Sequence, residues 1–146
     1  MANQTTLALD FLDRARQFRR AYELLRNVKQ PPVWPQYSLF YHAIELTLKA
    51  YILQRGVTPE DLNEKFSHDT KLLVNEAIKL GLSLPKGVEE FIATLSEPIE
   101  NLDTFPTQVR MRYPPNGPVY SLGQFEPHMF QLCEAVAKAL DLPHFF

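Results

Sequence analysis

Residues 37–53 decide the fold, and they read YSLFYHAIELTLKAYIL. Two apolar stripes with helical spacing run along this stretch, one starting at Tyr37 and the other at Leu39. A helix that is apolar around so much of its circumference is typical of a central element packed on several sides. One polar line interrupts it, because spacings of four, three and four place four side chains on one edge, Ser38, His42, Glu45 and Lys49.

The flanking sequence predicts further helices on both sides of this central one. The central helix should run from Trp34-Pro35 to Gly56, because proline is tolerated in a first turn and glycine commonly follows a last one. Apolar periodicity predicts other helices near residues 7–25, 67–81, 83–98 and 126–140. The proline-rich stretch 103–123 has no helical period. We therefore expect one all-α domain over residues 1–146, an antiparallel bundle of four to five helices with a long proline-rich loop before the last helix.

Composition excludes several classes of protein. The chain has 15 basic and 17 acidic residues, a net charge of -2, which argues against coating nucleic acid by charge alone. Cys133 is the single cysteine, so we expect neither an intramolecular disulfide nor a cysteine-based metal site. The N-terminus lacks a signal-peptide pattern, and charges interrupt the most apolar stretch. The sequence thus predicts a cytoplasmic protein without a membrane segment, a metal or a cofactor.

The polar line of the central helix has two interpretations. His42 beside Glu45 could handle a proton or orient a phosphate ligand, and Lys49 could contact that ligand. Alternatively, Glu45 and Lys49 form an ion pair four residues apart in the favourable order, along the solvated edge of the helix. The second interpretation is favoured, because structural ion pairs commonly line helices and His-x-x-Glu supplies too few ligands for a metal.

His68-Asp69 precedes the next predicted helix. A histidine there could bind an anion, since helix N-termini favour negative charge. A capping turn is the favoured alternative, with Ser67 as N-cap, Asp69 complementing the helix dipole and His68 filling a gap. His68 and His42 are the two candidates for catalysis.

Arginines gather in two further places. Arg110, Arg112 and Tyr113 lie in the proline-rich loop and suit phosphate recognition with stacking. Alternatively, Arg112 could fold back to pair with Glu45 or with a helix C-terminus and so hold the loop in place. These two interpretations are evenly balanced. The first helix carries five arginines: Arg14, Arg16, Arg19, Arg20 and Arg26. Because acidic residues lie among these arginines, a solvated amphipathic face is favoured over an RNA-binding surface.

Together these motifs resemble the HEPN family of helical domains. Residues 41–53 read YHAIELTLKAYIL, residues 68–73 read HDTKLL, and Gly56, Gly81-Leu82 and Arg112-Tyr113-Pro114 occur in the family's order. The resemblance covers most of the chain. It implies a bundle of four to five helices, often dimeric and associated with nucleotides or RNA, in which Glu45, Lys49, Asp69 and Arg112 form a structural polar network.

Many HEPN proteins are metal-independent ribonuclease toxins paired with antitoxins, and their active site is an arginine followed four to six residues later by histidine. No arginine stands at that spacing before His42, His68, His128 or His144. We therefore expect a non-catalytic module of a toxin–antitoxin or defence-like system that binds a nucleotide, RNA or a cognate protein as a homodimer. One alternative is a metal-independent ribonuclease with a dispersed active site. Another is a structural homodimer whose exposed face includes Tyr37, Phe40 or Phe125.

Overall fold

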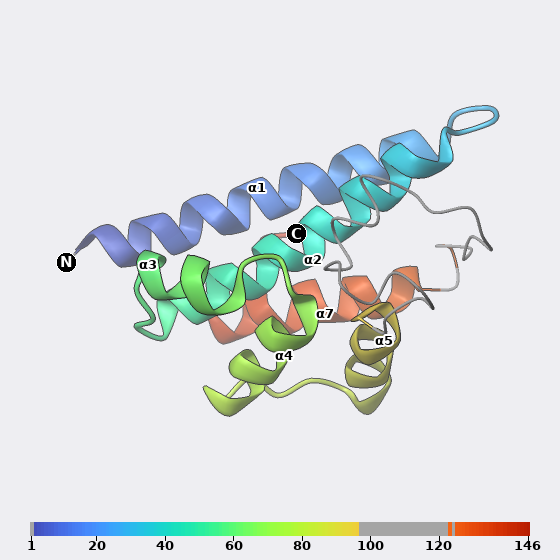
Figure 1. Ribbon diagram of the computed structural model, residues 1–146. Coiled ribbons are helices and arrows are strands. Elements are labelled where there is room, and N and C mark those ends of the chain that lie inside the picture. The colour runs from blue at the N-terminus through green and yellow to red at the C-terminus, as the bar shows by residue number, and fades with distance from the viewer. Residues whose placement is uncertain (1, 97–122, 124) are drawn as a thin grey trace.

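The computed structural model describes residues 2–96, 123 and 125–146, and Figure 1 shows their arrangement. Five longer helices, one short helix and one π-helical turn make up the elements described. They are α1 (Ala2–Arg26), α2 (Val33–Gln54), α3 (Pro59–Asp61) with the π-helical turn η1 (Leu62–Phe66), α4 (Thr70–Lys79), α5 (Lys86–Ser96) and α7 (Glu126–Ala139). No strand occurs in the described residues, so the predicted all-α class is confirmed. Most of the predicted 103–123 loop lies outside the described residues.

The central position predicted for α2 is confirmed. α1 runs antiparallel along α2, which also packs against α4 and α7 (Figure 1). Buried side chains follow both of its apolar stripes, among them Phe40, Ile44, Leu48 and Leu53. Burial of such side chains stabilises the fold by about 1.5–3 kcal/mol each relative to exposure. Tyr37 and Phe40 are buried rather than exposed, so they cannot form the dimer face considered above.

Local backbone chemistry sets where the helices end. α2 is followed by Gly56 at φ 104° and α4 by Gly81 at φ 109°, a left-handed conformation that glycine adopts without steric cost. The N-cap of α4 is Asp69 and not Ser67 as predicted, because the Asp69 carboxylate accepts hydrogen bonds from the backbone N–H groups of Lys71 and Leu72. Ser67 instead adopts φ 44° directly after η1 and turns the chain toward α4.

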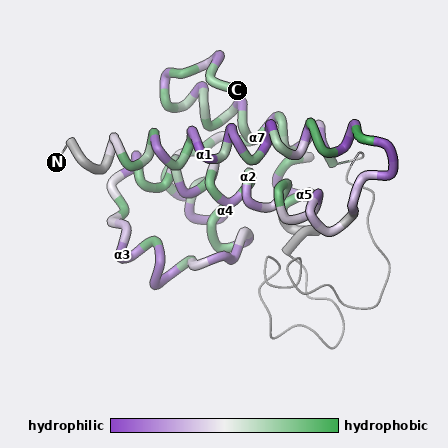
Figure 2. The backbone as a smooth tube through the Cα atoms, turned by 90° about the horizontal axis from the view of Figure 1, so that it is seen from above, coloured by the Kyte–Doolittle hydropathy of each residue, from purple (hydrophilic) through white to green (hydrophobic). Residues whose placement is uncertain are grey.

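α1 covers one side of the bundle with one face and meets solvent with the other. Hydrophobic and hydrophilic residues alternate along it in Figure 2. Ala8, Leu12, Ala15 and Tyr22 are buried, whereas Arg16 and Arg20 are exposed. In the part of the chain that the structure describes, no helix is both long and apolar enough to cross a membrane.

Candidate functional site

The polar line of α2 contains a buried ionic cluster centred on Glu45. The Glu45 side chain is 5% exposed, and its Oε2 accepts a hydrogen bond from Lys49 Nζ at 3.1 Å. Its Oε1 lies 3.0 Å from His68 Nδ1, which reaches it from the turn before α4. The carboxylate is thus held by a cation on its own helix and by a histidine that is distant in sequence.

This geometry corrects the expectation of a solvated edge. Glu45 and Lys49 are both buried, and the η1–α4 turn brings His68 to within hydrogen-bond distance of Glu45. The expected partner Arg112 lies outside the described residues, as do Arg110 and Tyr113. Asp69, expected in the same network, caps α4 through its backbone contacts. A buried carboxylate whose two oxygens already have donors serves to hold α2 and α4 together.

His42 contacts a different element. Its Nδ1 lies 2.7 Å from the backbone oxygen of Ser38, so Nδ1 carries the proton and donates it to that carbonyl. Its ring stacks on Phe18 of α1, with centroids 4.9 Å apart and planes inclined by 16°. The two catalytic candidates are therefore held in separate surroundings, His42 against α1 and His68 against Glu45. The described residues contain no group of three or more side chains that could hold a metal ion.

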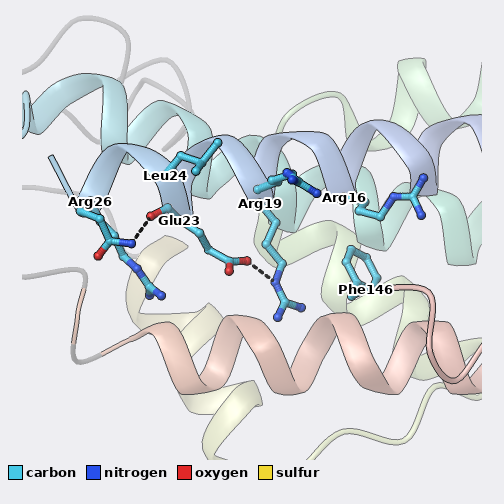
Figure 3. Close-up of a pocket in the computed structure, with 8 residues that line it drawn as sticks. Arg16, Arg19, Glu23, Leu24, Arg26 and Phe146 are labelled. Carbon is cyan, nitrogen blue, oxygen red and sulfur yellow. Dashed lines mark hydrogen bonds and ion pairs between the residues drawn. The ribbon is translucent and has the colours of Figure 1, made fainter.

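A hollow lined by charged side chains lies elsewhere, along α1. It has a volume of about 390 Å³ and is lined by one face of α1 together with Phe146. Figure 3 shows Arg19 extending from α1 toward α7, with Phe146 beside it. Four guanidinium groups and one carboxylate line this arginine hollow, from Arg16, Arg19, Arg20, Arg26 and Glu23.

The four arginines differ in how fully they are neutralised. Arg16 pairs with Asp13 at 2.6 Å, but both side chains are at least 40% exposed, so the pair is weak and exchangeable. Arg26 pairs with Glu126. Arg20 forms no ion pair with any described residue. The hollow thus keeps positive charge for a ligand even though the whole chain is slightly acidic.

Arg19 forms the inner wall of the arginine hollow. Its Nε donates to Glu23 at 3.0 Å, and its guanidinium carbon lies 4.1 Å from the ring centroid of Phe130 and 5.4 Å from that of Phe146. Its Nη1 is buried without a hydrogen-bond acceptor among the described residues. Arg19 is thus held between Glu23 and two aromatic rings, which fixes the position of its guanidinium group.

One hydrogen-bonded cluster fastens α1 to α7 beside the hollow. Tyr22 Oη donates to Glu126 Oε1 at 2.6 Å, and Arg26 pairs with the same carboxylate. Burial, reinforced by the bond to Glu126, raises the pKa of the Tyr22 phenol well above its usual value. The hydrogen bond of Arg26 itself to Glu126, opposed by burial, raises the pKa of Arg26. These contacts hold Arg26 at the end of the hollow in one position.

The sequence indicates part of the arginine hollow. Spacings of three and four place Arg16, Arg19, Arg20, Glu23 and Arg26 on one face of a helix. From sequence alone, such a face is expected to be solvated. The missing element was Phe146, which is distant in sequence and reaches the hollow through the C-terminal turn. Chemically, guanidinium groups beside an aromatic ring suit binding of a phosphate or carboxylate next to a planar group.

No known protein family, curated protein or solved structure matches this chain.

Proposed function

We propose that this chain is a HEPN-like, non-catalytic helical module that binds phosphate groups of nucleotides or single-stranded RNA in the arginine hollow. The observation that carries the proposal is the lining of that hollow by four guanidinium groups and one carboxylate. Arginine binds phosphate through paired N–H donors with fixed geometry, and its charge steers an anionic ligand toward the surface.

Arg20 and Arg16 are the primary phosphate contacts in this proposal. Arg20 has no ionic partner among the described residues, and Arg16 can exchange its exposed partner Asp13 for a ligand. Arg19 and Arg26 shape the site from fixed positions, since each already holds a carboxylate. Phe146 supplies an adjoining apolar surface.

The test is fluorescence anisotropy of a 3′-labelled single-stranded RNA octamer at 50 mM salt. The double variant R16E/R20E should weaken binding at least tenfold. Raising the salt to 200 mM should weaken wild-type binding about tenfold, as expected for release of two or three counterions. R14E is the matched control, because Arg14 lies on the same helix and pairs with Asp10 but does not line the hollow.

Circular dichroism of each variant should show the wild-type helical signal, so that a loss of binding does not come from lost helical structure. Absence of wild-type binding at 50 mM salt would refute the proposal. An equal loss of affinity in R14E and R16E/R20E would also refute it, because binding would then depend on the overall charge of α1.

A further inference from the structure

A second hollow adjoins the arginine hollow. It has a volume of about 400 Å³ and lies beside the last turn of α7 and the chain's C-terminal turn. Arg19 and Phe146 line both hollows, so these two side chains form the wall between them. Each hollow is large enough to hold a small ligand group, and the shared wall makes them neighbours.

The second hollow also suits an anion. Lys138 and His144 line it together with one carboxylate, Glu134. Neither Lys138 nor His144 forms an ion pair with a described residue, and both are exposed. Lys138 thus places a positive group on the other side of the shared wall from Arg16 and Arg20.

The wall itself carries features of a stacking platform. Phe146 is a half-buried aromatic ring that borders both hollows, and it contacts the ring of Phe145 edge-on at 5.7 Å. Phe145 in turn lies 4.5 Å from the guanidinium carbon of Arg16. The contact between Phe145 and Arg16 therefore anchors the C-terminal turn on α1 and holds Phe146 in place. A phenyl ring fixed in this way can stack a nucleobase with little ordering cost.

We infer that the two hollows form one site for a 5′-phosphorylated dinucleotide unit of a single strand. One phosphate lies against Arg16 and Arg20, the other against Lys138 and His144, and a base stacks on Phe146 between them. This inference rests on the proposed function and adds the number of phosphates, their placement and the position of the base. The Arg19 side chain lines both hollows and so lies at the boundary that such a ligand crosses.

Isothermal titration calorimetry of the full chain at 50 mM salt tests the inference with three probes, the dinucleotide pApA, AMP and inorganic pyrophosphate. pApA should bind at least tenfold more tightly than AMP, since it alone offers two phosphates separated by a nucleoside. K138E should lower the affinity for pApA to that for AMP and leave AMP binding unchanged. F146A should weaken pApA at least fivefold.

K79E is the matched control for K138E, because Lys79 is likewise the basic residue in the last turn of its helix but lies outside both hollows. It should change no affinity. Equal binding of AMP and pApA would overturn the two-phosphate site while leaving the proposed function intact. Pyrophosphate binding as tight as that of pApA would overturn the stacking role of Phe146. Absence of binding by all three probes, with the RNA octamer also unbound, would overturn both proposals.

Discussion

Removing the Glu45 carboxylate should destabilise this protein far more than removing an exposed carboxylate that likewise pairs with a cation four residues later. In E45A, Lys49 Nζ loses the carboxylate 3.1 Å away, although the Lys49 side chain is only 11% exposed. His68 loses the same acceptor. Breaking a buried pair by removing one partner costs about 3–5 kcal/mol. The His68 side chain is 40% exposed and Lys49 can extend toward water, so we expect about 2–4 kcal/mol here.

The assay is urea unfolding followed by far-UV circular dichroism. With a slope of about 2 kcal/mol per molar urea, E45A should lower the midpoint by about 1–2 M. D10A is the matched control, because Asp10 and Arg14 have the same i,i+4 order but are 47% and 57% exposed. Its expected cost is about 0–0.5 kcal/mol.

A double-mutant cycle separates the charge from the packing. E45Q keeps the side-chain volume but leaves Lys49 without a counter-charge, whereas E45Q/K49M removes both charges. The double variant should be more stable than the sum of the single effects predicts, by about 1–2 kcal/mol. An E45A midpoint within about 0.2 M of wild type, or a cycle with no coupling, would refute the reasoning. RNA binding by folded E45A should equal that of wild type, since Glu45 does not line the arginine hollow.

Four further outcomes are expected. Burial raises the pKa of the Cys133 thiol to about 11, so the protonated thiol is favoured in the folded chain. The stability that the protonated Cys133 thiol contributes is fully present below about pH 9 and is lost as the pH rises through about 11. At pH 8 a thiol reagent should therefore modify Cys133 only when the protein unfolds. Y22F removes the 2.6 Å hydrogen bond to Glu126 and should lower the free energy of unfolding in urea by about 1–2 kcal/mol. An unchanged free energy of unfolding would show that this hydrogen bond contributes nothing to stability. G81A forces a side chain to φ 109° and should cost about 1–2 kcal/mol, whereas an unchanged midpoint would show that the turn relaxes freely. Light scattering should give a mass near twice 16.9 kDa if the expected homodimer forms, and a monomeric mass at high concentration would contradict it.

The helices were largely predictable because their signals are local. The stripes of α2 repeat at helical spacing, and Gly56 and Gly81 mark the ends of α2 and α4 through their backbone freedom. The start of α4 was misplaced by two residues, since Ser67 and Asp69 are both good caps and the π-helical turn that selects Asp69 has no clear sequence signal.

The site was less predictable because it depends on contacts between distant residues. A charged line on a helix usually faces water, and nothing near Glu45 in sequence announces that His68 covers it. Likewise, the spacing of Arg16 and Arg20 indicates a shared face, but only the path of the C-terminal turn brings Phe146 to it. Helix periodicity identifies faces, and tertiary packing decides which of them become sites.

The antiparallel pairing of α1 with α2 has a consequence for the order of assembly. A short turn joins the two helices, so their contacts close at small sequence separation and should form early in folding, whereas α7 must return from the far end of the chain. The arginine hollow exists only once α7 and the C-terminal turn have docked on α1. Occupancy of the hollow should therefore slow amide hydrogen exchange in α7 more than in α2, because a bound phosphate would stabilise the docked position of α7.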